Sequence, residues 1–397
     1  MTTPDTDAPA AVSPGASHMH SPARRAGPLR IFIVIGTRPE AIKMASVIAA
    51  LRSRRDVECR VCSTGQHGLM LTRTFEDLGY APDQSLDILD AGRTLAGNLS
   101  VALQRLDEAL AAYAPDWVLV QGDTTSAAAG AMAAFLRKVR VGHVEAGLRT
   151  GISADPFPEE AYRRMISTVT TLHFAPTQQA RENLLRENIR AGDILVTGNT
   201  VIDALFAMRT RLNEEPLASQ LEREFNWLDS RRRILLVTAH RRENQGAGLR
   251  HLCEALLQLA HRSDIEIVFP VHSSPVVHQP VRALLEARPH IHLLEPQPYS
   301  RFIHLMTIAY LVLTDSGGIQ EECTALGRPA FVIRDTTERA EGIQAGATRL
   351  IGCSPAQIVS EVTRFFDDAS VGHNRLQASA TFGDGSAGRR IVESLLG

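Results

Sequence analysis

Apolar and polar positions along the chain group into short blocks that predict alternating strands and helices. Uninterrupted apolar runs of a few residues predict buried strands, and longer stretches in which apolar residues recur every three or four positions predict helices. In the first half, strands are expected at 29–35, 57–62, 116–120 and 140–144, and helices at 41–51, 95–113 and 127–138. Strands that are apolar on both faces and alternate with helices favour a parallel, doubly wound sheet.

The same order of elements restarts after a candidate boundary near Gly198. Strands are expected at 233–238, 265–271, 310–314 and 329–333, with helices starting near 248 and covering 319–326. We therefore expect an α/β protein of two Rossmann-like domains, covering 29–197 and 198–377, with a cleft between them. Ligands of such sheets bind beyond the carboxyl ends of the strands. Residues 1–28 are rich in Pro, Ala, Ser and Thr. They lack both hydrophobic periodicity and the apolar core of a secretory signal, so a disordered leader is expected.

Composition narrows the classes of partner. The 397 residues fit two domains, and 42 basic against 44 acidic side chains leave a formal charge of −2. A near-neutral chain argues against nucleic acid or an anionic membrane as the main partner, and no apolar run approaches the roughly 18–20 residues that span a bilayer. Five cysteines in a chain of this length favour a reducing compartment. Cys59 and Cys62 are expected to be buried strand residues rather than a redox pair or half of a metal site.

Two turns that follow predicted strands are candidates for phosphate binding. The sequence Ser-Gly-Gly at 316–318 precedes a helix, where backbone N–H groups and the helix dipole attract an anion; an ordinary tight turn is the alternative. In the turn at 36–40, Arg38 can grip a phosphate as a fork, and Lys43 lies about one helical turn later. A solvated helix N-terminus is the alternative there. Lys43 and Lys138 are the only lysines of the chain, which favours a functional role for Lys43.

Several titratable side chains lie at or just beyond the ends of predicted strands. Asp123, Glu145 and Glu159 could face one cleft and perform acid–base chemistry, although Asp123 could equally cap a helix. His240 directly follows a strand and could serve a leaving group or a diphosphate, with packing or surface exposure as the alternative. No cluster of His and Cys has the spacing of metal ligands, so no metal is expected. These residues alone do not specify a reaction.

Longer ordered strings identify a family. They are GTRPEAIKMA (36–45), QGDTTS (121–126), GHVEAGLRTG (142–151), PFPEEA (156–161), HFAPT (173–177), TGNTVIDAL (197–205), TAHRREN (238–244), LTDSGGIQEE (313–322), RDTTER (334–339) and FGDGSAGRRI (382–391). At this spacing, from about Arg30 to the C-terminus, the chain resembles the non-hydrolysing UDP-N-acetylglucosamine 2-epimerases.

The resemblance implies a fold and a reaction. The fold would be of the two-domain glycosyltransferase B type, with a C-terminal helix at 378–397 that crosses back to the first domain. The reaction would interconvert UDP-GlcNAc and UDP-ManNAc without an added cofactor, by elimination of UDP to a bound 2-acetamidoglucal and re-addition. The resemblance further implies a cytoplasmic homodimer.

The resemblance also implies roles for individual residues. The acid–base set would be Asp123, Glu145 and Glu159, with His240 steadying UDP as it leaves and returns. The other residues of the UDP-sugar site would be Arg38, Ser316, Gly317 and Gly318 at the diphosphate, Glu322 at the ribose, Gln297 and Phe302 at the uracil, and Lys43 and Arg339 nearby.

The chain departs from the family at four positions, which are Leu69, Tyr162, Ser274 and Ala340. Leu69 and Ser274 bear on a second, regulatory UDP-sugar pocket, to which Gln66, His67, Arg93 and His272 would contribute. Tyr162 and Ala340 replace the usual Asn and Pro and bear on the sugar pocket and domain closure. The alternative functions are epimerisation of a modified UDP-sugar such as a UDP-diacetamido uronate, a hydrolysing epimerase that releases ManNAc and UDP, a glycosyltransferase of the same fold, and a non-enzymatic UDP-sugar sensor.

Overall fold

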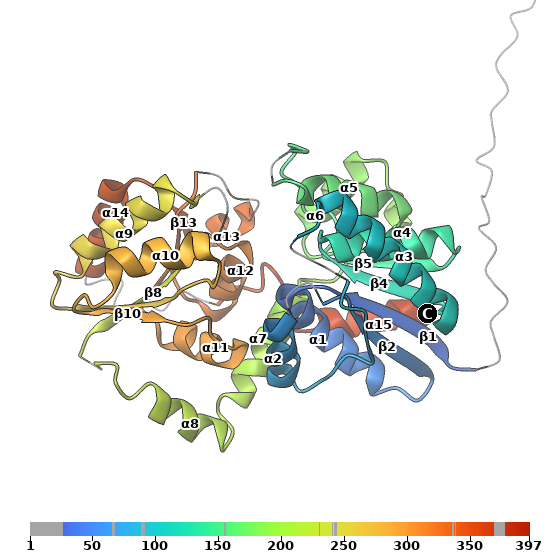
Figure 1. Cartoon of the computed structure of the whole chain (residues 1–397), viewed down its shortest axis with the longest axis horizontal. Coiled ribbons are helices and arrows are strands. Elements are labelled where there is room, and N and C mark those ends of the chain that lie inside the picture. The colour runs from blue at the N-terminus through green and yellow to red at the C-terminus, as the bar shows by residue number, and fades with distance from the viewer. Residues whose placement is uncertain are drawn as a thin grey trace, which may run out of the picture.

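Two parallel sheets with helices on their faces form the body of the protein (Figure 1). The computed structural model describes residues 27–65, 68–88, 92–154, 156–229, 231–239, 241, 244–335, 337, 339–368 and 378–397. Core clusters lie on both faces of each sheet, as a doubly wound architecture requires. The predicted α/β class with two Rossmann-like sheets is therefore confirmed. Residues 1–26 of the expected leader lie outside the described part of the chain.

The first sheet has the strand order β3-β2-β1-β4-β5-β6-β7, with every pairing parallel. Its strands are β1 (Leu29–Ile35), β2 (Val57–Ser63), β3 (Gln84–Ser85), β4 (Trp117–Gln121), β5 (Arg140–Val144), β6 (Leu172–Ala175) and β7 (Ile194–Val196). The helices between them are α1 (Arg38–Arg52), α2 (Gly68–Leu78), α3 (Leu95–Tyr113), α4 (Thr125–Leu136), α5 (Glu159–Val169), α6 (Gln178–Arg186) and the 3₁₀ turn η1 (Ala191–Asp193).

The second sheet has the order β10-β9-β8-β11-β12-β13 and is also parallel throughout. Its strands are β8 (Arg233–Thr238), β9 (Ile265–Pro270), β10 (Ile291–Leu294), β11 (Leu311–Thr314), β12 (Ala330–Val332) and β13 (Thr348–Leu350). The remaining helices are α7 (Thr200–Arg211), α8 (Leu217–Glu224), α9 (Ala247–Leu259), α10 (Pro275–Leu285), α11 (Tyr299–Ile308), α12 (Gly317–Leu326), α13 (Ala340–Gln344), α14 (Pro355–Asp367) and α15 (Ala387–Leu396).

Where a predicted element has an observed counterpart, the two differ mainly at helix starts; several short strands and helices, among them all those between 145 and 197, were not predicted. The strands expected at 29–35, 140–144 and 233–238 and the helix at 95–113 have the predicted bounds. α4 begins two residues earlier than expected, because the hydroxyl of Thr124 accepts the N–H of Ala127 and caps the helix there. Polar caps set these starts, whereas the predictions followed the first apolar residues.

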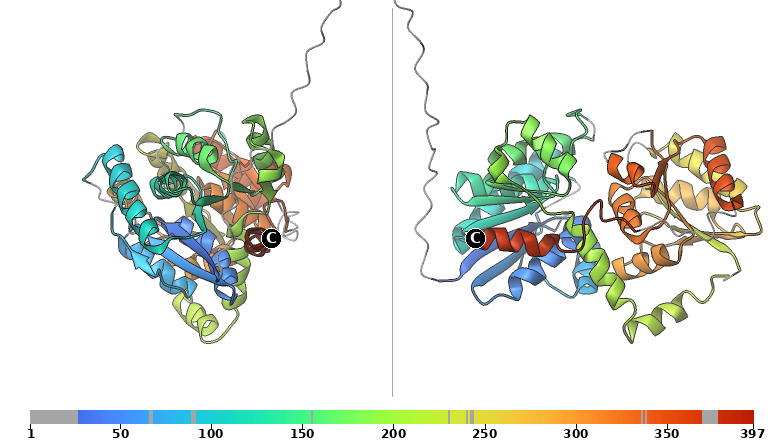
Figure 2. Two further views of the ribbon diagram at one scale, coloured as in Figure 1. Left: turned by 90° about the vertical axis from the view of Figure 1, so that its right-hand side faces the viewer. Right: turned by 180° about the vertical axis from the view of Figure 1, so that it is seen from behind.

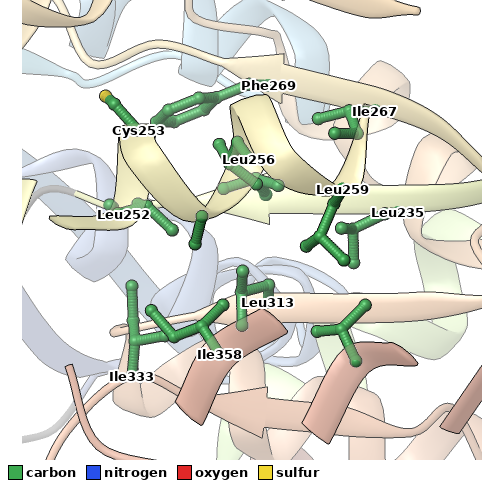
Figure 3. Close-up of a cluster of buried hydrophobic side chains, with 14 of the residues drawn as sticks. Leu235, Leu252, Cys253, Leu256, Leu259, Ile267, Phe269, Leu313, Ile333 and Ile358 are labelled. Atoms are coloured by element: carbon green, nitrogen blue, oxygen red, sulfur yellow. The ribbon is translucent and has the colours of Figure 1, made fainter. Parts of the chain in front are cut away.

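The core of the second sheet illustrates how the apolar pattern becomes packing. Leu235 and Phe269 on neighbouring strands point into the same layer as Leu256 of α9 (Figure 3). Leu235, Leu256 and Phe269 are completely buried, so each contributes about 1.5–3 kcal/mol relative to an exposed position. Strands buried on both faces explain why their sequences read as continuous apolar runs rather than alternating ones.

The chain crosses between the two sheets at two adjacent points. The backbone N–H of Asn199, just before α7, donates to the carbonyl of Phe382 (2.6 Å). Gly198 and Gly383 lie beside each other here, with φ of +86° and +144°, and a Cβ on Gly198 would approach the Cα of Gly383 to 3.0 Å. Only glycine adopts this backbone at low cost while permitting that approach.

After the second crossing, α15 lies along α1 on the first sheet, far from the sheet that precedes it in sequence (Figure 2). Asp203 of α7 accepts the backbone N–H groups of Ala387 (3.2 Å) and Gly388 (2.8 Å), which begin this helix. Ile391 and Leu395 are buried in the same cluster as the first-sheet strands. The C-terminal helix therefore completes the first core.

The five cysteines are free, and Cys62 is buried on β2 while Cys59 is half-buried there. Burial raises the pKa of both thiols to about 12, which makes them unreactive at neutral pH. Within the described ranges, no helix has both the length and the apolar character needed to cross a bilayer.

Glu40 in the first turn of α1 joins two loops that border the cleft. Its carboxylate accepts the N–H groups of Gly36 (2.9 Å) and Thr37 (2.6 Å), forming a capping box with Thr37. The hydroxyl of Thr124, after β4, donates to its other oxygen (2.7 Å). Burial raises the pKa of Glu40 to about 7, although these hydrogen bonds act against the shift.

This pKa predicts a pH-dependent contribution to stability that a Glu40→Gln variant should lack. The folded protein keeps a proton that the unfolded chain loses above about pH 4.5, so the contribution is complete below that pH and is lost as the pH rises through about 7. Between pH 4.5 and 8 the free energy of unfolding of the wild type should therefore fall by roughly 3 kcal/mol more than that of the variant. Urea denaturation across this range measures the difference.

Glu76→Gln is a matched control, because Glu76 is an exposed carboxylate on α2 and its removal should leave the pH dependence unchanged. Parallel pH profiles for wild type and Glu40→Gln would show that the Glu40 carboxyl is ionised throughout.

Candidate active site between the two sheets

The strand orders locate a binding site before any side chain is considered. The order of the first sheet reverses between β1 and β4, and that of the second reverses between β8 and β11. Loops on either side of such a reversal separate and leave a crevice at the carboxyl ends of the strands. Arg38, the first residue of α1 after β1, donates to the carbonyl oxygen of Gln297 in the second half of the chain (2.7 Å). The two crevices therefore open toward each other.

A cavity of about 620 Å³ lies between them. Its walls include residues from both halves of the chain, and most of the predicted site residues are among them. The predicted residues that line it are Arg38, Lys43, Asp123, Glu145, Glu159, His272, Gln297, Phe302, Ser316, Gly317, Gly318, Glu322 and Arg339. Arg93 does not line it, and Gln66, His67 and His240 lie outside the described residues.

Glu145, directly after β5, is the most tightly held carboxylate of the cavity. Both of its oxygens accept from the ammonium of Lys43 (2.8 and 2.5 Å), and the amide of Gln121 donates to Oε2. Its backbone has φ +65°, a left-handed conformation that is strained for a residue with a side chain. Burial acts to raise the pKa of Glu145, but Lys43 and Arg339 outweigh burial and hold the pKa below its ordinary value. The carboxylate is therefore ionised at neutral pH.

Asp123, after β4, is held by an arginine that the sequence analysis did not single out. Arg163 of α5 contacts Asp123 Oδ2 through both Nε (2.7 Å) and NH2 (2.6 Å), and its NH1 donates to the buried Glu160 (3.0 Å). Below this turn, Nε2 of His143 donates to the carbonyl of Gly122 (2.8 Å). Burial lowers the pKa of His143 to about 4, so the imidazole is neutral. The contacts leave Oδ1 of Asp123 available to a ligand.

Glu159 differs from the other two carboxylates. It is the first residue of α5, half-buried and part of the cavity wall. Its side chain makes no hydrogen bond or ion pair with any residue in the described ranges. Of the three predicted acid–base carboxylates, Glu159 is therefore the one that no cation contacts in the described part of the chain.

The turn before α12 has the geometry of an anion site. Ser316 is the N-cap of this ten-residue helix, so the first backbone N–H groups and the positive end of the helix dipole face the cavity. A Cβ on Gly318 would meet nothing within 4 Å, which leaves the backbone open to a ligand. A Cβ on Gly317 would lie 2.7 Å from Cζ of Arg339, so the absence of a side chain allows that guanidinium to lie on the turn.

On the far side of this turn, a buried hydroxyl and carboxyl form a polar pair. The hydroxyl of Tyr299 donates to Glu322 (2.9 Å). Burial raises the pKa of Glu322 to about 7, with the hydrogen bond from Tyr299 opposing the shift. Gln297 and Phe302 line the cavity next to this pair. An aromatic ring and an amide in this position suit a flat heterocycle.

Several residues of the site were missed by sequence reasoning. Arg163 could have been found, because it lies four residues after Glu159 and helical spacing puts both on one face. Asn199 and Glu321 carry no comparable signal, since their contacts cross between halves of the chain. Tyr162 lines the cavity and is also buried against α4, whereas the side chains of Leu69 and Ala340 lie outside the described ones.

Of the residues predicted for the regulatory pocket, Arg93 and His272 lie in the described part of the chain. Arg93 is exposed and donates to the carbonyl of Ile88 (2.9 Å), while the backbone N–H of Ser274 donates to Nδ1 of His272 (3.1 Å). Across the described ranges, no three His, Cys, Asp or Glu side chains are grouped closely enough to hold a metal ion.

Comparisons with known proteins give one consistent result. The sequence model of the family described as UDP-N-acetylglucosamine 2-epimerase matches residues 49–396. A UDP-N-acetylglucosamine 2-epimerase of Salmonella typhimurium is 45% identical over 369 residues, covering 92% of this chain and 98% of that protein. The corresponding protein of Escherichia coli K12 is 44% identical with the same coverage.

Solved structures agree with these sequence matches. The crystal structure of UDP-GlcNAc 2-epimerase from Neisseria meningitidis bound to UDP-GlcNAc has a TM-score of 0.89 at 40% identity, covering 93% of this chain and all of that one. The enzyme from Methanocaldococcus jannaschii in complex with UDP-GlcNAc and UDP has a TM-score of 0.82 at 32% identity, covering 93% and 99%. By sequence and by structure, this chain belongs to the UDP-N-acetylglucosamine 2-epimerase family.

Proposed function

We propose that this chain interconverts UDP-GlcNAc and UDP-ManNAc by a non-hydrolysing inversion at C2. The C1–O bond to UDP breaks as the C2 proton is removed, which gives 2-acetamidoglucal and UDP in the cavity. UDP then adds back to C1 while a proton is delivered to the opposite face of C2. The observation that carries the proposal is a single cavity between the two sheets. Its first wall, formed by loops of the first sheet, holds the carboxylates, and its second wall, formed by loops of the second sheet, holds the anion-binding turn.

The second wall is suited to the nucleotide. The diphosphate would lie on the turn Ser316–Gly318, where Arg339 already contacts Gly317 and Arg38 approaches from the opposite wall. Glu322 would bind the ribose, and Gln297 and Phe302 would hold the uracil. His240 would steady UDP as it leaves and returns, since its chain neighbours Ala239 and Arg241 both line the cavity. The bound UDP-GlcNAc in the Neisseria meningitidis relative supports this substrate.

The three carboxylates are expected to have different roles in the reaction, depending on which cation contacts each of them. Glu159 has no cation within the described ranges and is assigned to the C2 proton. Inversion at C2 requires a second group that delivers a proton to the opposite face of the sugar. We give this role to Asp123, whose Oδ1 is available to a ligand. Glu145 is held ionised by Lys43 and would stabilise the positive charge that develops at C1 as UDP leaves.

Related reactions remain the competing functions. Epimerisation of a C3- or C6-modified UDP-sugar would use the same walls, and Tyr162, which lines the cavity, would alter the fit. A hydrolysing epimerase would release ManNAc and UDP instead of returning UDP to C1.

The reaction predicts a specific isotopic outcome. Proton NMR of UDP-GlcNAc with the protein in D₂O should show UDP-ManNAc with deuterium at C2, because the returning proton comes from solvent-exchanged groups. Free ManNAc as the first product would identify the hydrolysing reaction. Turnover of a modified UDP-sugar alone would reassign the substrate.

The assignment of Glu159 predicts a separation of binding from turnover. Glu159→Gln keeps the shape of the side chain and removes its proton chemistry, so kcat should fall by about 10²–10⁴-fold while UDP affinity stays within about twofold, since Glu159 lies on the opposite wall. Calorimetry with UDP and the NMR assay measure the two quantities. The matched control is Glu182→Gln on the exposed face of α6. A Glu159→Gln variant that turns over at the wild-type rate would refute the assignment.

We further propose that the chain works as a homodimer in the cytoplasm. Phe135 and Leu136 at the end of α4 are 49% and 64% exposed and adjacent in sequence. Exposed apolar side chains grouped in this way favour a protein partner, and five free cysteines suit a reducing compartment.

Light scattering should give twice the chain mass of 43.3 kDa, and Leu136→Asp should reduce that mass to a single chain if α4 supplies the contact. A wild type with the mass of one chain would exclude the dimer.

A further inference from the structure

Glu321 is a buried carboxylate to which the proposed reaction gives no role. It precedes Glu322 on α12, and its side chain is 2% exposed. Oε1 accepts from Nε of Arg339 (2.9 Å), and Oε2 accepts from the amide of Asn199 (2.5 Å). Both oxygens act as acceptors, which is the pattern of an ionised carboxylate; burial raises the pKa of Glu321, and Arg339 acts against that shift. A buried charge with two strong donors is expensive to maintain, so its partners are informative.

Asn199 connects this carboxylate to the other wall of the cavity. Its Nδ2 donates to Glu321 and also to Oε1 of Glu145 (3.2 Å), so both amide hydrogens are used, one on each side. Its Oδ1 accepts the N–H of Val201 (3.2 Å) and its own N–H donates to Phe382 (2.6 Å). The side chain is therefore fixed at both ends, at the point where the chain crosses between the sheets.

Arg339 connects Glu321 to the anion-binding turn. Its guanidinium lies against Gly317, with Glu321 at 2.9 Å and Glu145 at 3.8 Å. Lys43 and Arg339 together balance Glu145 and Glu321 in charge. If Glu321 lost its charge, Glu145 would remain as a carboxylate within 4 Å of Arg339 among the described residues. A shift toward Glu145 would take the guanidinium away from the turn.

We propose that Glu321 is a positioning residue that sets both walls of the active site. Through Arg339 it aims a guanidinium at the diphosphate, and through Asn199 it fixes the carboxylate of Glu145. This inference rests on the proposed function, because it assumes that a UDP-sugar occupies the cavity. The two connections predict different consequences for binding and for turnover.

The first test is Glu321→Gln, which preserves the size of the side chain. One of its two oxygens becomes an amino group that faces a donor, so at least one connection is lost. Isothermal calorimetry should show UDP binding about 10-fold weaker or more, the range expected for a charge-assisted hydrogen bond, and kcat for UDP-GlcNAc should fall as well. Glu254→Gln, on the exposed side of α9, is the matched control and should change neither.

The second test is Asn199→Ser. Serine is a good N-cap and should keep the start of α7, but it removes both amide N–H groups. UDP affinity should stay within about twofold, because Arg339 keeps Glu321, whereas kcat should fall about 10-fold through Glu145. In the double variant, the loss of kcat should be smaller than the product of the two single losses, since residues that share a connection give non-additive effects.

Thermal unfolding of each variant separates positioning from stability. UDP affinity and kcat that are unchanged in Glu321→Gln would overturn the inference, and so would losses of equal size in both quantities for both variants, which a general loosening of the fold produces. A wild type that epimerises UDP-GlcNAc normally while Glu321→Gln is unaffected would refute only this inference. A wild type that neither binds UDP nor epimerises would refute the proposed function and the inference together.

Discussion

The ion pair between Lys43 and Glu145 is the interaction on which the cavity depends. Glu145 is buried and has a left-handed backbone, and an uncompensated charge in such a place costs several kcal/mol. Lys43 lowers that cost only because α1 presents it to the end of β5. The start of α1 is in turn fixed by the capping box of Thr37 and Glu40. The capping box after the first strand thereby helps to keep Glu145, more than a hundred residues later in the chain, paired with Lys43.

The same principle recurs on the neighbouring loop with different residues. Arg163 supports Asp123 and is itself held by the buried Glu160, which also accepts the backbone N–H of Thr150 (3.1 Å). Glu145 and Asp123 are thus each held by a cation from a neighbouring helix, Lys43 of α1 and Arg163 of α5. Glu159 alone is left without such an anchor within the described ranges. Charges that are already fixed in place require little reorganisation when charge develops on a substrate.

The sequence predicted the parts of this arrangement that depend on local pattern. Parallel strands such as β1, β5 and β8 are buried on both faces and appear as apolar runs, so their ends, and hence the polar loops, could be located. β6, β7 and β13 have only three or four residues, too few to show a period. Helices such as α6 are polar over most of their surface and bury only Ala180 and Leu184, and no element was predicted between 145 and 197.

Contacts between the halves of the chain could not be predicted in this way. The bond from Asn199 to Glu321 joins residues 122 positions apart, and that from Arg38 to Gln297 joins residues 259 apart. Such pairs depend on how two completed sheets dock, which no spacing within either half encodes. The family resemblance supplied residues that bind substrate, but it gave no reason to select the residues that support them.

The return of α15 to the first sheet has a consequence for the order in which the protein is made. Ile391 and Leu395 fill the same core as β1 and α1, although nearly the whole chain separates them. During synthesis the first sheet can form early, but the part of its apolar face that Ile391 and Leu395 cover stays exposed until α15 has been made. The main core cluster of the second sheet does not depend on such a distant segment, because it is formed by residues between Leu235 and Phe366. The half of the protein that is synthesised first is therefore the half that is completed last.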